Sequence, residues 1–273
     1  MKKIKLLSLL FIIVLLSGCM RQNTIDDKTI IIGASVSPHA EILMQTRSYL
    51  ETKGYQLRIV EFTEYIQPNV GVSDGSLDAN FFQHQPYLDQ YNEENKTDLV
   101  SVMKVHFEPL AIYQGKSKTL DINDGATIGV PNDVTNEARA LLLLDQLGLI
   151  VVDRSKGLKA TKLDIISNPK RIKIVEMEAA AIPSKLPDLD FGIINGNVAL
   201  TAKITDKLII NSSEDPYGEI AQKYGNVLAI KKGNEDKEAI RILIEALYQP
   251  NIIQYINDRY SGAVIYLDKS PSN

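Results

Sequence analysis

The chain has 273 residues, of which 44% are hydrophobic, and its 30 Lys and Arg against 34 Asp and Glu give a formal net charge of −4. This length suits two lobes of ordinary size, each with its own hydrophobic core. The negative net charge argues against the basic surface on which nucleic-acid binding depends. The single cysteine excludes a disulfide framework and a thiolate metal site in the body of the protein.

The N-terminal segment predicts export and lipid anchoring. Three lysines in the first five residues precede an apolar run, Leu6 to Leu16, that ends in Ser17-Gly18-Cys19. A cationic start, an apolar stretch too short to span a bilayer and small residues before a cysteine are typical of a lipoprotein signal peptide. We expect residues 1–18 to be this signal peptide and residues 19–28 to be a tether that is lipidated at Cys19. The mature protein would then be anchored on the extracytoplasmic face of the cell membrane; the alternative is an uncleaved anchor with an incidental cysteine.

Downstream of the tether, short β-rich runs alternate with helical patterns. The run at 29–35 is followed by a helical pattern at 40–53 and a second run at 56–62, and the alternation continues to two final helices near 236–247 and 251–260. Continuous apolar strands that alternate with helices are typical of mostly parallel sheets covered on both faces. The predicted fold class is therefore α/β.

Two apolar strands are candidates to carry the chain from one lobe to the other and back. They are Leu110 to Tyr113 and Asn226 to Ile230. Together with the chain length, they predict one lobe formed by residues 29–112 and 227–273 and a second lobe formed by residues 113–226.

Gly71 to Gly75 matches the G-x-S-x-G pattern that surrounds the nucleophilic serine of many hydrolases. That pattern requires a buried strand directly before the serine, and a proline and an asparagine at positions 68 and 69 interrupt the run before Ser73. An exported serine hydrolase that uses Ser73 with His84 or His106 is therefore the alternative from another functional class.

The histidines do not have the spacing of a metal site. His39, His84 and His106 lack the i, i+4 pairs and the short loops that build a preformed site. We predict no metal site and no other cofactor.

The junction after the strand that ends at Val130 is a candidate ligand site. A helix follows that Asp133 or Thr135 can cap, and ligands of open α/β sheets collect where strand ends meet helix starts. Arg139 lies near the first turn of this helix, where the macrodipole disfavours a cation by about 0.3 to 1 kcal/mol. An anionic partner is expected, either a ligand carboxylate held by a bidentate contact or a protein acid such as Glu137 or Asp133.

Asparagines stand at the ends of two later strands. Asn195 and Asn197 follow an apolar strand that ends at Ile194, and Asn226 begins another apolar run. Each amide offers donors and an acceptor, which suits an ammonium or a carboxylate. Asparagine after a strand is also a common turn former, so both interpretations stay open.

Six segments, taken together, resemble the NlpA family, the methionine-binding lipoproteins of ABC importers. These segments are PHAEIL, FTEYIQPN, LDANFFQHQPYL, HFEPLAIY, IGVPNDVTNEARALLLL and IINGNVAL. They occur in the family's order and cover essentially the whole mature chain.

The resemblance implies a two-lobed, periplasmic-binding-protein-like (type II) fold, each lobe a mostly parallel sheet with helices on both faces and the ligand in the cleft. It implies a monomeric solute-binding lipoprotein rather than an enzyme. Its ligand would be L-methionine or a close analogue, delivered to the permease and ATPase subunits of an ABC importer.

The resemblance also implies which residues bind the ligand. The side-chain pocket would consist of Tyr65, Phe82, His84 and Tyr87, and the zwitterion would be held by Arg139, Asn195 and Asn226. His84 would be a packed, neutral ring that offers an N–H toward the thioether sulfur. A thioether gains about 0.3 to 1.5 kcal/mol from each aromatic contact, which fits such a pocket.

Two departures from the family pattern keep the exact ligand open. Val198 stands where an aromatic residue is usual, and the segment before Asn226 is longer than the family's Ser-Pro-Tyr-x-Asn motif. Asn226 keeps the Tyr-x-Asn spacing, whereas an alignment at Asp215-Pro216-Tyr217 would put Glu219 in its place. The alternative ligands are another amino acid or a methionine-containing dipeptide, and a second role as an adhesin would require a large exposed apolar patch.

Overall fold

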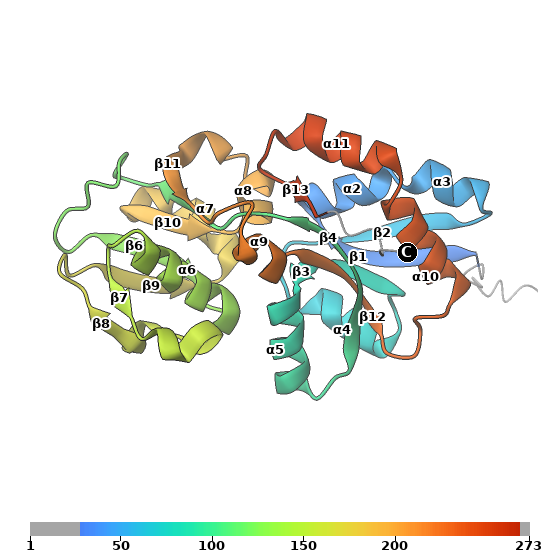
Figure 1. The fold of residues 1–273 in the computed structure, drawn as a ribbon, viewed down its shortest axis with the longest axis horizontal. Helices are drawn as coiled ribbons and strands as arrows, with labels where there is room; N and C mark the ends of the chain where they lie inside the picture. The colour runs from blue at the N-terminus through green and yellow to red at the C-terminus, as the bar shows by residue number, and fades with distance from the viewer. Residues whose placement is uncertain (1–27, 268–273) are drawn as a thin grey trace, which may run out of the picture.

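The computed structural model describes residues 28–267, which form the two bodies seen side by side in Figure 1. The predicted signal peptide, Cys19 and the predicted tether up to residue 27 lie outside the described residues. Within the described part of the chain, no helix is both long enough and apolar enough to span a membrane.

The first sheet combines the N-terminal strands with two strands from the C-terminal part of the chain. Its order is β13-β4-β12-β3-β1-β2. The strands are β1 (Thr29–Ser35), β2 (Gln56–Phe62), β3 (Ala79–His84), β4 (Leu99–Phe107), β12 (Asn226–Lys231) and β13 (Ile265–Tyr266). Strand β1 pairs in parallel with β2 and β3, whereas β12 lies antiparallel between β3 and β4.

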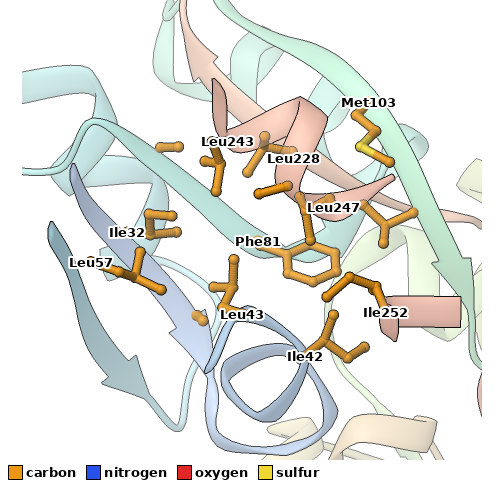
Figure 2. Packing of buried hydrophobic residues seen from close by; sticks show 14 of the residues in the cluster. Ile32, Ile42, Leu43, Leu57, Phe81, Met103, Leu228, Leu243, Leu247 and Ile252 are labelled. Carbon is orange, nitrogen blue, oxygen red and sulfur yellow. The ribbon is translucent and has the colours of Figure 1, made fainter. Parts of the chain in front are cut away.

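Helices cover both faces of this sheet because its strands bury side chains on both sides. On one face, alternate residues of β1 pack against η1 (Val36–Ala40), α2 (Glu41–Met44), α3 (Arg47–Thr52), α10 (Glu238–Leu247) and α11 (Pro250–Tyr260). Figure 2 shows this core, where Phe81 lies among side chains of α2 and α10. On the other face, Ile31 and Val227 pack against α4 (Gln67–Asp74) and α5 (Gln85–Asn95).

The second sheet has the order β11-β5-β10-β6-β9. Its strands are β5 (Ala111–Gln114), β6 (Thr127–Pro131), β9 (Lys173–Met177), β10 (Phe191–Ile194) and β11 (Leu208–Ser213). Helix α6 (Val134–Gln146) packs on one face, and α7 (Ile182–Lys185) and α8 (Gly196–Thr201) pack on the other. The remaining short elements are β7 (Val151–Val152), η2 (Arg154–Lys159), η3 (Lys162–Asp164), β8 (Ile165–Ser167), η4 (Ala179–Ala181), η5 (Leu186–Asp188), η6 (Thr205–Lys207) and α9 (Glu219–Lys223).

The chain crosses between the two sheets twice, from β4 to β5 and from β11 through α9 to β12. The α/β class with helices on both faces is confirmed, but the prediction of mostly parallel sheets is wrong. Both sheets are mixed, because the segments that cross between the lobes pair as antiparallel strands, β4 and β12 in the first sheet and β5 in the second. The predicted lobe boundary after residue 112 falls inside β5, and the boundary after residue 226 falls at the start of β12. The predicted helical pattern at 40–53 is divided into α2 and α3.

Candidate ligand-binding site

The structure brings the seven predicted ligand-binding residues together from both lobes. Strand β3 and the start of α5 supply the aromatic residues and His84, Tyr65 lies between β2 and α4, and Asn226 begins β12. Arg139 lies on α6, and Asn195 is the residue before α8. The site therefore lies where the two sheets face each other, at the ends of strands from both.

The aromatic residues form one cluster. The ring centroids of Tyr65, Phe82 and Tyr87 are 5.9 to 6.0 Å from one another, and the His84 ring lies 6.3 Å from that of Tyr87. A cavity of about 20 Å³ is lined by these residues together with Gln83 and Asn136. This volume holds about one water molecule, and Tyr65 and Tyr87 also line a larger cavity of about 190 Å³.

His84 is held in one neutral tautomer. The backbone N–H of Tyr87 donates to its Nδ1 at 3.1 Å, so Nε2 carries the proton and donates to Asn136 Oδ1 at 3.2 Å. Burial, reinforced by the nearby charge of Arg139, lowers the pKa of His84 to about 3. The ring is neutral as predicted, but its N–H points to Asn136, a residue that the sequence analysis did not single out.

Arg139 is paired with a buried acid. Its Nε and NH2 groups donate to the two carboxylate oxygens of Glu214 at 3.0 and 2.6 Å, and its guanidinium lies 4.2 Å from the ring centre of Tyr224. The expected pairing with a protein acid is therefore present, but the acid is neither of the two named from the sequence. Asp133 caps α6 through the backbone N–H of Asn136, and Glu137 accepts the backbone N–H of Lys162. Glu214 also accepts the backbone N–H of Leu110 at 2.9 Å, so it connects both crossings between the sheets to Arg139.

Asn136 accepts hydrogen bonds from side chains of both lobes. Its Oδ1 accepts from Arg139 NH1 at 3.1 Å, from Asn195 Nδ2 at 2.9 Å and from His84 Nε2. Because Asn195 uses its NH₂ group in this contact, its Oδ1 is left as a buried acceptor that no described residue satisfies. The sequence could have indicated Asn136, because this residue lies one helical turn before Arg139 on the same face of the predicted helix.

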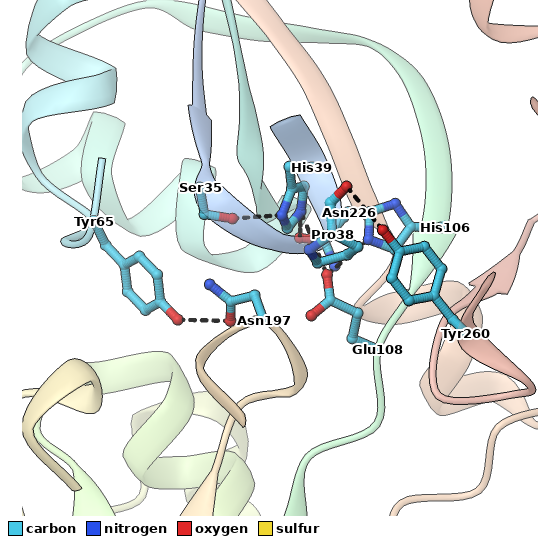
Figure 3. A network of polar contacts seen from close by, with 9 residues as sticks. All are labelled: Ser35, Pro38, His39, Tyr65, His106, Glu108, Asn197, Asn226 and Tyr260. Atoms are coloured by element: carbon cyan, nitrogen blue, oxygen red, sulfur yellow. Dashed lines mark hydrogen bonds and ion pairs between the residues drawn. The ribbon is translucent and has the colours of Figure 1, made fainter. Parts of the chain in front are cut away.

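Two further amides lie at the contact between the lobes. The hydroxyl of Tyr65 donates to Asn197 Oδ1 at 2.9 Å, which bridges the two lobes (Figure 3). Asn226 is buried, and its Oδ1 accepts from His39 Nε2 at 3.2 Å. Because Oδ1 is used in this contact, the NH₂ group is the remaining hydrogen-bonding group of the Asn226 side chain. Glu219, the alternative to Asn226, is exposed on α9.

The structure does not support a serine hydrolase at Ser73. Ser73 lies within α4, not at a turn from a strand into a helix. The two candidate bases are engaged elsewhere: His84 contacts Asn136, and His106 contacts Glu108 at 2.7 Å. Neither predicted histidine is therefore shown as a base for Ser73.

Two of the histidines meet although their sequence spacing did not indicate it. The rings of His39 and His106 lie 4.8 Å apart, and their nitrogens and the Glu108 carboxylate all lie within 4.8 Å of one another. All three side chains are buried. The group has the composition of a small metal site, a cluster that the sequence spacing did not indicate.

Comparison with known proteins identifies the family. The profile of the NlpA lipoprotein family matches residues 30–267. The chain belongs to the NlpA lipoprotein family. The resemblance inferred from the six sequence segments is thereby confirmed.

Individual relatives in this family are similar over nearly their whole length. The methionine-binding lipoprotein MetQ of Bacillus subtilis is 36% identical over 279 residues, which cover 97% of this chain and 98% of the relative. A lipoprotein structure from Ruminococcus gnavus matches with a TM-score of 0.86 and 46% identity, covering 88% of this chain and 100% of that chain. A nutrient-binding protein from Burkholderia cenocepacia bound to methionine matches with a TM-score of 0.81 and 34% identity, at 88% and 100% coverage. These similar proteins are named as lipoproteins and binding proteins, not as enzymes.

Proposed function

We propose that the protein is an extracytoplasmic solute-binding lipoprotein that captures L-methionine or a close analogue for an ABC importer. The observation that carries the proposal is the pairing of two recognition surfaces between the lobes. The buried Arg139 and its neighbouring amides suit a zwitterion, and the aromatic cluster beside neutral His84 suits a thioether. The names of the similar proteins support the same ligand.

Binding in this proposal is a shift toward a closed arrangement of the lobes, with no bond made or broken. The contacts from Tyr65 to Asn197 and from His84 to Asn136 join residues of opposite lobes. They stabilise the closed arrangement, and the amino acid adds contacts to both lobes at once. Release to the permease requires these contacts to break, so their modest individual strength of about 1 kcal/mol suits a transport cycle.

The anchoring and partners follow from the same proposal. Cys19 carries the lipid that holds the protein at the outer face of the cell membrane, and a monomer delivers its solute to permease and ATPase subunits. The lobes are residues 29–112 with 227–273, and residues 113–226. No group in the proposed site acts as a nucleophile, so the protein binds its solute without catalysis.

Isothermal titration of residues 20–273 with L-methionine tests the proposal. The protein is unfolded and refolded first to remove any bound solute. We expect saturable one-to-one binding of L-methionine. A panel of further solutes is then titrated, namely D-methionine, other amino acids and a methionine-containing dipeptide. Failure of every solute in the panel to bind the refolded protein would contradict the proposal.

A second candidate ligand is a methionine-containing dipeptide, because a larger cavity adjoins the site. Its volume is about 470 Å³, and Tyr65, Asn197 and Val198 are among its lining residues. Val198 occupies the position at which the family usually has an aromatic residue, so this space is wider than the family pattern implies. Tight dipeptide binding with weak methionine binding would select this candidate.

Replacing Asn226 with alanine is expected to weaken L-methionine binding by about tenfold or more, since a hydrogen bond to a charged group contributes about 1.5 to 3 kcal/mol. Glu219→Ala is the matched control and should change affinity by less than about twofold, because Glu219 is exposed outside the site. Titration of both variants checks the assignment. A loss confined to Glu219→Ala would instead favour the alternative alignment.

A further inference from the structure

Three buried amide side chains link helix α4 to strand β3 beside the aromatic cluster. Asn69 and Asn80 are fully buried, and only 3% of Gln83 is exposed. Asn69 lies in the first turn of α4, whereas Asn80 and Gln83 lie on β3. Buried amides are costly unless they are hydrogen-bonded, so their partners decide what they contribute.

The three amides satisfy one another. Asn69 Nδ2 donates to Gln83 Oε1 at 2.8 Å, and Gln83 Nε2 donates to Asn69 Oδ1 at 2.6 Å and to Asn80 Oδ1 at 2.9 Å. Asn80 Nδ2 donates to Asn69 Oδ1 at 2.7 Å and to the carbonyl oxygen of Pro68 at 3.0 Å. Hydrogen bonds are directional and apolar packing is not, so this amide network of Asn69, Asn80 and Gln83 fixes the position of α4 along β3.

A bulge in β3 makes the amide network possible. Residues three apart on a regular strand point to opposite faces, so Asn80 and Gln83 would not normally meet. The pairing of β3 with β12, however, shifts its register between Phe81 and Gln83, which leaves Phe82 as the extra residue of β3. The bulge turns Gln83 to the face of Asn80, and it falls at a residue of the aromatic cluster.

The two elements that the amide network joins carry the walls of the aromatic cluster. Tyr65 lies just before α4, and the Glu64 carboxylate accepts backbone N–H groups at the start of this helix, which fixes the turn around Tyr65. Phe82 and His84 flank Gln83 on β3, and Gln83 itself lines the cavity of about 20 Å³ between these rings. The network therefore sets the spacing between the Tyr65 ring and the rings carried by β3.

We propose that the amide network fixes the width of the side-chain pocket, and that Gln83 is thereby a positioning residue that determines how large a ligand side chain the protein accepts. This inference rests on the proposed function and concerns the apolar half of the ligand. The network and the aromatic cluster both lie on elements of the first sheet and its helices, so the width is set before the lobes close. A pocket of fixed width favours the methionine side chain over one that is longer by a methylene.

A purely structural role is the competing explanation. Replacing all members of a hydrogen-bonded group with apolar residues of similar shape is close to neutral for stability, so the network is not needed to hold α4 on the sheet. Val72 already packs α4 in the apolar cluster that contains Ile31 and Val227. The test therefore measures ligand selectivity in addition to stability.

The test compares L-methionine with L-ethionine, whose side chain is longer by one methylene, in the wild type and in Gln83→Leu. We expect the wild type to bind L-ethionine at least about tenfold more weakly than L-methionine. Gln83→Leu should reduce this ratio to about threefold or less, because α4 and Tyr65 are no longer fixed to β3. Titration calorimetry measures both affinities. An unchanged ratio in the folded variant, or equal affinity of the wild type for the two ligands, would overturn the proposal.

Val72→Ala is the matched control, because Val72 is fully buried on the same helix and lies outside the amide network. It should lower the free energy of unfolding in urea and leave the selectivity ratio unchanged. An equal fall of the ratio in Val72→Ala and Gln83→Leu would show that any loosening of α4 has this effect and would overturn the specific role of the network.

A triple variant covers the case in which Gln83→Leu does not fold. Asn69→Leu, Asn80→Leu and Gln83→Leu together leave no unpaired amide of the network, and this protein should lose the same selectivity. The titrations also separate the two proposals. If the wild type binds neither ligand, methionine recognition in the proposed function fails; if it binds methionine and the variants keep the wild-type ratio, only the role of the amide network fails.

Discussion

Arg139→Lys is expected to weaken L-methionine binding by about 100-fold, within the range of about 2 to 5 kcal/mol for loss of one partner of a buried charged contact. A guanidinium has five N–H groups. Three of them are used by Glu214 and Asn136, which leaves two for a ligand carboxylate. Lysine has one nitrogen and cannot serve both carboxylates in the same geometry. Titration of the variant measures the loss.

Arg139→Ala is less informative by itself because it leaves Glu214 buried without its partner. Removing one member of a buried ion pair costs about 3 to 5 kcal/mol of stability. The double variant Arg139→Met with Glu214→Gln removes both charges and is the matched control for folding. A folded Arg139→Lys or double variant that binds methionine with nearly unchanged affinity would contradict the role of Arg139.

Alanine substitutions at two adjacent phenylalanines are expected to have different effects, one on the free energy of unfolding and the other on ligand affinity. Phe81→Ala should lower the free energy of unfolding by about 3 to 5 kcal/mol, because Phe81 is fully buried in the core shown in Figure 2. Phe82 points to the opposite face of β3 and packs with Tyr65 and Tyr87. Phe82→Ala should lower methionine affinity by about tenfold through lost ring contacts and apolar burial.

Urea unfolding without ligand and titration with methionine measure both effects in each variant. Phe81→Leu is the control for the core, since it keeps most of the buried volume and should cost clearly less stability than Phe81→Ala. The expected pattern is a large stability loss for Phe81→Ala and a large affinity loss for Phe82→Ala. The reverse pattern would show that β3 presents its other face to the ligand.

Much of the fold and part of the site could be predicted from local sequence patterns. Apolar runs such as residues 29–35 form strands buried on both faces, and Asp133 caps the helix that carries Arg139. The aromatic cluster could also be predicted, because Phe82, His84 and Tyr87 lie within six residues of one another. In such cases the backbone period and the short spacing decide which side chains share a face.

Only the tertiary structure decided which distant polar groups pair with one another. Glu214 lies 75 residues from Arg139, and Asn226 lies 187 residues from His39, so no spacing rule connects them. The insertion of β12 between β3 and β4 brings Asn226 beside His84 and His106. Local patterns specify helices, strands and their buried faces, whereas the partner of a buried charge depends on which segments the long-range strand pairing places side by side.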